Sequence, residues 1–550
     1  MEKKKIKLFS TIALVALALL VVGATYAYFQ NQYGSASNAD VKVTTYTTDV
    51  LTFETGDAIN ISADQDTFAQ GKGNQTGSTF ARATLQANNK TNTATANYNV
   101  YLNIENNTFT YTNTGTPELI LQVVDKTSGN PVTSITGLNY VTVIDGKNTS
   151  ISGFDITNKK GLIALFSNKE ISASPKTVEE YTITITLVNH NFDQNVNTGK
   201  NLNGKLIVQK EKMITSISDV AKNGDALATV LETLGTKGDP SLTGLYHHDA
   251  NLTNGAGDNS YRYAGANPNN YVCFGSDDTT CPVDNLYRII GVFDGKVKLI
   301  HAYGATTDML GTNEGYAKTY QAAHGSASGY KGNGDLTKIG TYKWNKTSKN
   351  TWSTSTTNTI NLNNNFLTYL DSKNAKWKTM IADTTWYVGG MTSANGCYSN
   401  AKTAYNYEVG ANKDATTTVT SKIGLMYVSE YYYGATTDYW TLPGYNSSGH
   451  DDYRTAINDN WLYTGLFEWT LSRYSEFSFS AFSVYDDGHV ESVSVDDSLG
   501  YAVRPSFSLS SSIKFTSGEG TAVNPIRIKS WLGDYACLGP DWRTVLKKHR

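Results

Sequence analysis

The segment Trp461–Pro505, WLYTGLFEWTLSRYSEFSFSAFSVYDDGHVESVSVDDSLGYAVRP, indicates a fold more clearly than any other part of the 550-residue sequence. Aromatic and serine residues alternate irregularly after Tyr474, and a short polar turn follows at Asp486-Asp487-Gly488. Aromatic residues favour strands, and Asp-Gly is typical of a tight turn. We therefore expect strands joined by a turn, which present aromatic and hydroxyl side chains from a sheet.

The segment divides into an expected framework and an expected binding face. The framework comprises Trp461, Trp469, Val503, Arg504 and Pro505, and we also expect Phe479 in the core. Tyrosine is a rigid contact residue and serine an adaptable hydrogen bonder, which is the mixture found in binding loops. The alternative is that these rings only fill a core. The candidate ligand-binding residues are Tyr474, Ser475, Phe477, Tyr485, Asp486, Asp487, His489 and Tyr501.

The composition narrows the class of protein. The formal net charge is -3 and charged residues make up 17% of the chain, which argues against a nucleic-acid partner because such binding needs a basic surface. Tyrosine is frequent, with 36 residues, and proline is scarce, with 10. This mixture favours extracellular β modules, and the length predicts more than one domain.

The chain has four cysteines. Cys273 and Cys281 enclose the short loop CFGSDDTTC, so we expect them to form a disulfide after export, and the alternative is two free thiols. Cys397 and Cys537 could also pair, although no local pattern supports it. Because no Cys/His cluster has the spacing of a zinc site, we expect neither a metal nor a cofactor.

Residues 1–27 resemble a signal peptide. A lysine-rich start precedes an apolar run, and small residues at Thr25 and Ala27 suit cleavage after Ala27. The alternative is an uncleaved anchor over Leu8–Phe29. The sequence ATYAYF resembles the signal peptides of the camelysin/TasA group of Gram-positive surface proteins. This resemblance implies a secreted or cell-surface protein that meets the membrane only during export.

Residues 38–210 alternate apolar and polar residues, as strands do. Tyr98–Ile104, Leu119–Val124 and Tyr181–Leu187 are the clearest runs, and they predict an antiparallel β-sandwich. The pattern is similar to the TasA-type sandwich, which implies either a subunit that self-assembles into fibres or a plain spacer. Residues 211–259 are expected to form a helical connector and linker, with a helix over Met213–Leu234.

Residues 260–528 combine short strands with short helices. Asp294-Gly295 between two apolar runs predicts a hairpin of Leu286–Phe293 and Lys296–Ile300. Residues 365–381 predict one or two short helices, and Lys422–Val428 predicts a strand that continues to Tyr433. Residues 529–550 form an atypical tail with a basic end.

The second half carries Trp469-Thr-Leu-Ser472, Gly500-Tyr-Ala-Val-Arg-Pro505 and Asn524-Pro525. With Asn285–Phe293 these motifs resemble uncharacterised secreted proteins of gut Gram-positive bacteria. They also resemble the C-type-lectin-like fold, which formylglycine-generating enzymes and the variable proteins of diversity-generating retroelements share. The calcium motifs Glu-Pro-Asn and Gln-Pro-Asp of sugar-binding lectins are absent from the sequence. The retroelement resemblance implies that residues 474–501 could be diversified.

Catalytic patterns are weak. Asp486/Asp487, Glu491 and Asp496/Asp497 are explained as turns and solvated strand residues, and His247-His248 as a loop dipeptide. We therefore expect a mainly β protein, with an N-terminal antiparallel β-sandwich and a C-terminal α+β, C-type-lectin-like domain. The expected function is non-enzymatic recognition or adhesion with a surface glycan or protein as partner. The alternatives are a fibre or matrix subunit and a formylglycine-generating type of enzyme.

Overall fold

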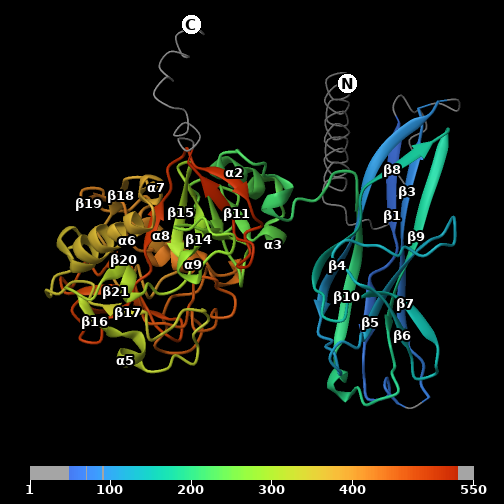
Figure 1. The fold of residues 1–550 in the computed structure, drawn as a ribbon, viewed down its shortest axis with the longest axis horizontal. Helices are drawn as coiled ribbons and strands as arrows, with labels where there is room; N and C mark the ends of the chain where they lie inside the picture. Colours follow the sequence, from blue (N-terminus) through green and yellow to red (C-terminus); the bar gives the residue numbers. More distant parts are fainter. Residues whose placement is uncertain (1–48, 70, 89–91, 531–550) are drawn as a thin grey trace, which may run out of the picture. The chain divides into compact units, whose positions relative to one another are not determined.

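The computed structural model describes residues 49–530, apart from residue 70 and residues 89–91 (Figure 1). The expected signal peptide at residues 1–27 and most of the tail at 529–550, with Cys537, lie outside the described residues. The chain is mainly β and divides into two compact units, with the division between Met213 and Ile214. Among the helices of the described residues, none is long and apolar enough to cross a membrane.

The first unit is the predicted antiparallel β-sandwich. Its six-stranded sheet runs in the order β1 (Val50–Thr55), β3 (Gln75–Gln86), β9 (Lys176–Leu187), β5 (Leu119–Asp125), β7 (Ser150–Asp155) and β6 (Tyr140–Ile144). Its four-stranded sheet runs in the order β2 (Ile59–Ser62), β10 (Asn201–Gln209), β4 (Ala94–Asn107) and β8 (Gly161–Ala173).

Alternation along the strands explains why these two sheets pack face to face. On β9, Ile183, Ile185 and Leu187 are fully buried, whereas the intervening Thr182 and Thr184 are partly exposed or paired across the sheet. Successive strand residues point to opposite faces, so one face of each sheet is apolar. The buried side chains of both sheets form one core.

The second unit has two six-stranded sheets and short helices. One sheet contains β11 (Leu245–His248), β12 (Ser260–Tyr263), β14 (Leu286–Phe293), β15 (Lys296–His301) and β24 (Ser506–Ser508), with β13 (Tyr271–Cys273) beside β14. The other runs in the order β16 (Tyr316–Thr319), β17 (Gly340–Tyr342), β23 (Tyr501–Ala502), β20 (Glu468–Arg473), β21 (Ser480–Val484) and β22 (Val490–Ser494). Two strand pairs complete the strands: β18 (Thr384–Tyr387) with β19 (Thr418–Ser421), and β25 (Lys514–Ser517) with β26 (Arg527–Lys529).

The helices of this unit are short. The α-helices are α2 (Leu227–Lys237), α3 (Pro240–Thr243), α4 (Thr307–Leu310), α5 (Tyr320–His324), α6 (Leu367–Lys373), α7 (Ala375–Thr379), α8 (Ala401–Glu408) and α9 (Val428–Tyr433). A π-helical stretch, Thr357–Phe366, leads directly into α6. Two short helices were predicted between residues 365 and 381, and α6 and α7 confirm them.

The hairpin predicted at Asp294-Gly295 is confirmed, because β14 and β15 pair antiparallel around it. The helix predicted over Met213–Leu234 instead begins at Leu227, since Gly224 adopts a φ of +96° that no helix continues. This helix, α2, is also not a free connector. It buries Leu227, Leu231 and Leu234 in the core of the second unit.

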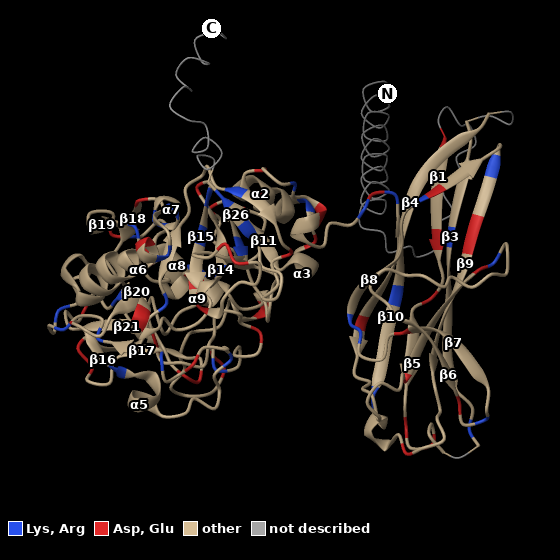
Figure 2. Ribbon diagram, in the orientation of Figure 1, with Lys and Arg blue, Asp and Glu red and all other residues tan. Residues whose placement is uncertain are grey.

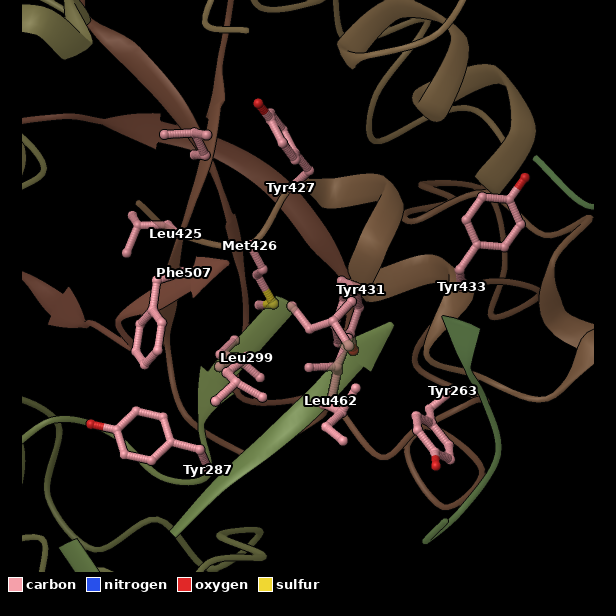
Figure 3. Packing of buried hydrophobic residues seen from close by; sticks show 14 of the residues in the cluster. Tyr263, Tyr287, Leu299, Leu425, Met426, Tyr427, Tyr431, Tyr433, Leu462 and Phe507 are labelled. Atoms are coloured by element: carbon pink, nitrogen blue, oxygen red, sulfur yellow. The ribbon is translucent and has the colours of Figure 1, made fainter. Parts of the chain in front are cut away.

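The strand predicted from Lys422 to Tyr433 is wrong, because its last six residues form helix α9. Glu430 accepts a hydrogen bond from the backbone N–H of Tyr427 at 2.9 Å and so caps this helix. All six residues of this helix are buried, so no alternation of apolar and polar residues distinguishes a helix from a strand in the sequence. Tyr427, Tyr431 and Tyr433 belong to the same buried cluster as Leu299 of β15 and Phe507 of β24, and Figure 3 labels these side chains.

Candidate functional site

The β21–β22 hairpin confirms the turn predicted at Asp486-Asp487-Gly488. The backbone N–H of Tyr485 donates to the carbonyl oxygen of His489 at 2.9 Å, and the N–H of Gly488 donates to the carbonyl oxygen of Tyr485 at 3.0 Å. Gly488 has a φ of +94°, where a side chain would be strained. The two ends of β21 therefore present two loops: residues 474–479 before it and residues 485–489 after it.

The expected framework residues are buried. Trp469 donates its indole N–H to the carbonyl oxygen of Tyr342 at 2.6 Å, and Trp461 donates to that of Tyr263 at 2.8 Å. The guanidinium Nε–H of Arg504 donates to Glu468 at 2.7 Å in an ion pair that is almost fully buried. These contacts fix β20 against β17 and against the segment that follows Gly500.

Phe479 is the exception, and its predicted core position is wrong. Its side chain is 46% exposed, because residues 475–479 form a loop that leaves the sheet before β21 begins. The side-chain amide of Asn350 fixes this loop by donating to the carbonyl oxygens of Tyr474, Phe477 and Ser480 at 2.7–2.8 Å. Asn350 thus determines where the aromatic residues of the loop point.

The first three candidate ligand residues, Tyr474, Ser475 and Phe477, all belong to this loop. Phe477 is 48% exposed and its ring centroid lies 4.9 Å from that of Tyr474 and 5.7 Å from that of Phe479. Ser475 is exposed, whereas Tyr474 is mostly buried beneath Phe477. Two exposed phenylalanine rings, with Tyr474 as their base, therefore form one end of the candidate face.

The residues Tyr485, Asp486, Asp487 and His489 lie together at the other loop. The His489 ring stacks on Tyr485 with a centroid distance of 4.3 Å, and its Nδ1 atom forms a hydrogen bond with Asp487. Partial burial opposes the charge on Asp487, but the hydrogen bonds and charge of His489 outweigh it, so the pKa of Asp487 is lowered. The carboxylate of Asp487 and the aromatic pair therefore adjoin one another.

Tyr501 does not join them at the surface. It is buried, with its ring stacked on Trp469 at a centroid distance of 4.7 Å. Its ring also lies 6.2 Å from that of Tyr485. Tyr501 therefore supports the candidate face from below and is not itself presented.

Sequence reasoning missed two members of this face, Tyr398 and Tyr445. The Tyr398 side chain is 51% exposed, and its ring lies 6.2 Å from that of Tyr445, which in turn lies 5.0 Å from that of His489. Both come from polar loops without strand periodicity, so no local pattern marked them. We call the set the aromatic strip: Phe477 and Phe479 at one end of β21, and Tyr398, Tyr445, Tyr485 and His489 at the other.

Charged side chains also lie beside the strip. Glu491 lies 3.7 Å from the Nε2 atom of His489, and the guanidinium of Arg454 lies 5.2 Å from the centroid of the Tyr445 ring. Charged residues are otherwise sparse along the ribbons of both units (Figure 2). The face therefore combines aromatic surface with a few hydrogen-bonding groups, as binding sites do.

Other residues weighed for chemistry are held by structural contacts. Asp496 accepts a hydrogen bond from the Ser494 hydroxyl at 2.6 Å, and the His247 ring stacks on Tyr261 with a centroid distance of 4.3 Å. His248 is buried. In the part of the chain that the structure describes, no group of three or more His, Cys, Asp or Glu residues is placed to hold a metal ion.

The predicted disulfide between Cys273 and Cys281 is confirmed, with a Cα–Cα distance of 5.8 Å. Within the described residues Cys397 is a buried thiol without a disulfide partner, and burial raises its pKa to about 11. At neutral pH this group is therefore protonated and a poor nucleophile.

Comparison with known proteins gives no family. No family model matches the chain, and no curated protein matches it. Among solved structures, the infectious bursal disease virus VP2 subviral particle has 12% identity and a TM-score of 0.09 over 32% of this chain and 45% of the viral chain. The Gx strain of the same virus has 12% identity and a TM-score of 0.09 over 32% of this chain and 40% of that chain. This chain therefore covers less than half of either viral chain.

Proposed function

We propose that the protein is a non-enzymatic recognition or adhesion protein that binds its ligand through the aromatic strip. The observation that carries this proposal is the exposure of Phe477, Phe479 and Tyr398, each 46–51% exposed, on one unit with a fixed framework. Exposing apolar surface to water costs a free energy of about 25 cal/mol per Å², and a ligand that covers these side chains removes this cost.

The chemistry of the strip favours a glycan or a protein surface as ligand. Aromatic rings provide rigid contact area at low entropic cost, and they lie beside the carboxylates of Asp487 and Glu491. Such carboxylates accept hydrogen bonds from sugar hydroxyls or from protein N–H groups. The strip lies on loops while its supporting residues lie on strands, which is the arrangement in which binding residues are held by a rigid scaffold.

The test is binding of the full chain to an array of glycans and proteins, repeated with Phe477→Ser/Phe479→Ser and with Tyr398→Ser. We expect these variants to lose binding of an array ligand by at least about tenfold, because the truncated rings carry the contact area. Val523→Ser is the matched control, since Val523 is 95% exposed and lies outside the strip. A ligand that binds all three variants as tightly as the parent chain would overturn the proposal.

An extracellular location belongs to the same proposal. The disulfide between Cys273 and Cys281 supports it, because disulfides persist in oxidising compartments. The resemblance of residues 1–27 to the camelysin/TasA signal peptides and of the second half to C-type-lectin-like proteins points the same way. N-terminal sequencing of the exported protein tests it: a mature chain that begins at Tyr28 is expected, whereas an intact residue 1 contradicts cleavage.

A fibre or matrix subunit is the second candidate function, and one observation favours it. Strand β8, with 13 residues, is the last strand in the order of its sheet, as β6 is in the other sheet. A long edge strand presents unpaired backbone groups that can pair with another chain. Electron microscopy of the purified chain distinguishes the two functions, because filaments favour assembly and monomers that still bind a ligand favour recognition alone.

A further inference from the structure

A hollow of about 320 Å³ lies beside the loop that carries Phe477 and Phe479. Arg473 at the end of β20 and Trp352 line it, with Val388 after β18 and residues 416–419 at the start of β19. Asn350, which holds the 474–480 loop, lines it as well. The hollow and the loop that carries Phe477 and Phe479 therefore share one supporting residue.

The hollow contains a cation, Arg473, for which no ion pair is formed within the described residues. The Nε–H of Arg473 donates to the carbonyl oxygen of Val388 at 2.9 Å, and within the described residues its two terminal amino groups form neither a hydrogen bond nor an ion pair. Arg473 is only partly exposed, and burial lowers its pKa while the charge of Asp414 opposes that shift. These amino groups are therefore left for water or for an anion that enters the hollow.

Asp414 is the nearest candidate partner, but its oxygens are engaged elsewhere. They accept hydrogen bonds from the hydroxyls of Thr416 and Thr417, each at 2.6 Å. These bonds, the Thr416 hydroxyl first, lower the pKa of Asp414 to about 2. Asp414 thus shapes the 414–417 turn and leaves the guanidinium of Arg473 open to the hollow.

The backbone beside the hollow is adapted to bring these groups together. Gly390 has a φ of +78°, and a Cβ atom there would overlap the side chain and the carbonyl oxygen of Arg473. A Cβ atom on Gly389 would overlap Asp414. Two adjacent glycines therefore allow Arg473 and the 414–417 turn to lie against the same stretch of chain.

The other groups around the hollow are donors and hydroxyls. Trp352 lines the hollow and is 1% exposed. Thr351, Ser353 and Thr418 add hydroxyl groups to the lining, each able to donate and to accept. The lining contains no carboxylate. Its preference is therefore for a negatively charged ligand group that is surrounded by hydroxyls.

We propose that this hollow binds the carboxylate of an acidic sugar, with Arg473 as the group that recognises the charge. A guanidinium matches a carboxylate in a two-point contact, and the rim of threonine and serine hydroxyls matches the hydroxyls of a sugar ring. The volume lies at the lower limit of ligand pockets, which suits one ring. The proposal rests on the proposed function, because the hollow supplies a charged subsite beside the loop that carries Phe477 and Phe479.

The experiment measures binding of sodium glucuronate, with glucose as the neutral counterpart, to the full chain by saturation-transfer NMR and calorimetry. Glucuronate is expected to bind at least about tenfold more tightly than glucose, since only glucuronate has the charge. Arg473→Gln is expected to weaken glucuronate binding at least about tenfold and to leave glucose unchanged. Lys318→Gln is the matched control, because Lys318 is an exposed cation on β16, at the far edge of the same sheet.

Two further arms separate the possible outcomes. N-acetyl-aspartate amide carries the same charge on a peptide-like frame, and if it binds as tightly as glucuronate, the acidic-sugar assignment fails. Equal binding of glucuronate to Arg473→Gln and the parent chain overturns the subsite itself. If the hollow acts as proposed, the Phe477→Ser/Phe479→Ser variant retains glucuronate binding. This result does not depend on whether the same variant loses binding of an array ligand, which tests the strip. Failure of the subsite and failure of the strip are therefore distinguishable.

Discussion

The carboxyl group of Glu408 should make the stability of the second unit depend on pH. Glu408 ends helix α8, is 4% exposed, and accepts hydrogen bonds from the backbone N–H groups of Val428 at 3.0 Å and Ser429 at 2.9 Å and from the Ser472 hydroxyl. Burial raises its pKa from 4.5 to about 7, and the hydrogen bonds only partly oppose the shift. No cation forms an ion pair with it within the described residues.

The sign follows from which state holds the proton. Between pH 4.5 and about 7 the folded chain keeps Glu408 protonated, whereas the unfolded chain has lost that proton, so stability falls as the pH rises. The pKa difference is 7 minus 4.5, about 2.5 units, and at 1.36 kcal/mol per unit the full effect is about 3 kcal/mol. Between about pH 5 and about pH 8 roughly 2.5 kcal/mol of this is lost.

The variant Glu408→Gln removes the titration and keeps the shape. Its amide NH2 replaces an oxygen that accepts from the N–H of Val428 or Ser429, and the cost of this change does not vary with pH, so it cancels from the pH dependence. All nine tryptophans of the chain lie after Met213, and tryptophan fluorescence during urea unfolding therefore reports the second unit alone. We expect wild type to lose about 2.5 kcal/mol more than the variant between about pH 5 and about pH 8.

Glu519→Gln is the matched control, because Glu519 is exposed and its removal leaves the pH dependence of wild type in place. The difference between wild type and Glu408→Gln cancels the other titrating groups, among them Glu468, whose pKa burial also raises. If the two chains lose the same stability over this range, to within about 1 kcal/mol, Glu408 is not protonated at neutral pH and the reasoning is refuted.

Three further predictions concern the framework, each measured as the free energy of unfolding in urea. Glu468→Gln leaves the buried Arg504 without its partner and should cost about 3–5 kcal/mol, and a cost near zero would show that the pair is solvated. Cys273→Ser with Cys281→Ser opens a short loop and should cost about 2–3 kcal/mol, less if the unfolded loop is already compact. Gly488→Ala forces a side chain into a φ of +94° and should cost about 1–2 kcal/mol, whereas an unchanged stability would mean that the turn relaxes.

Local patterns predicted the parts of the fold that local physics controls. The Asp486-Asp487-Gly488 turn, the hairpin at Asp294-Gly295 and the disulfide of Cys273 with Cys281 each depend on a few adjacent residues, and all three are confirmed. The sandwich followed from two-residue alternation over many strands, where errors at single positions cancel. In the second unit the expected burial of Trp469 is confirmed, whereas the expected burial of Phe479 is wrong.

The features of the structure that could not be predicted from the sequence depend on contacts between distant segments. Asn350 holds the loop of Phe479 from more than a hundred residues away, and Tyr398 meets Tyr445 only because two polar loops converge. Helix α9 was read as a strand since its buried residues leave no polar face to set a period. The hollow at Arg473 was missed for a similar reason, because an arginine at the end of a strand has no sequence signature of an unpaired charge.

Strand β20 explains why the strip and the hollow occur together. Its buried polar side chains are all satisfied internally: Glu468 by Arg504, the Thr470 hydroxyl by the carbonyl oxygen of Phe482 at 2.7 Å, and the Ser472 hydroxyl by Glu408. Arg473 is the next residue, and its charge has no such partner among the described residues. Arg473 is only partly exposed, and its terminal amino groups are left for solvent or for a ligand. The position of Arg473, where the rigid strand ends and the exposed loop begins, is therefore where a ligand would contact both the framework and the aromatic strip.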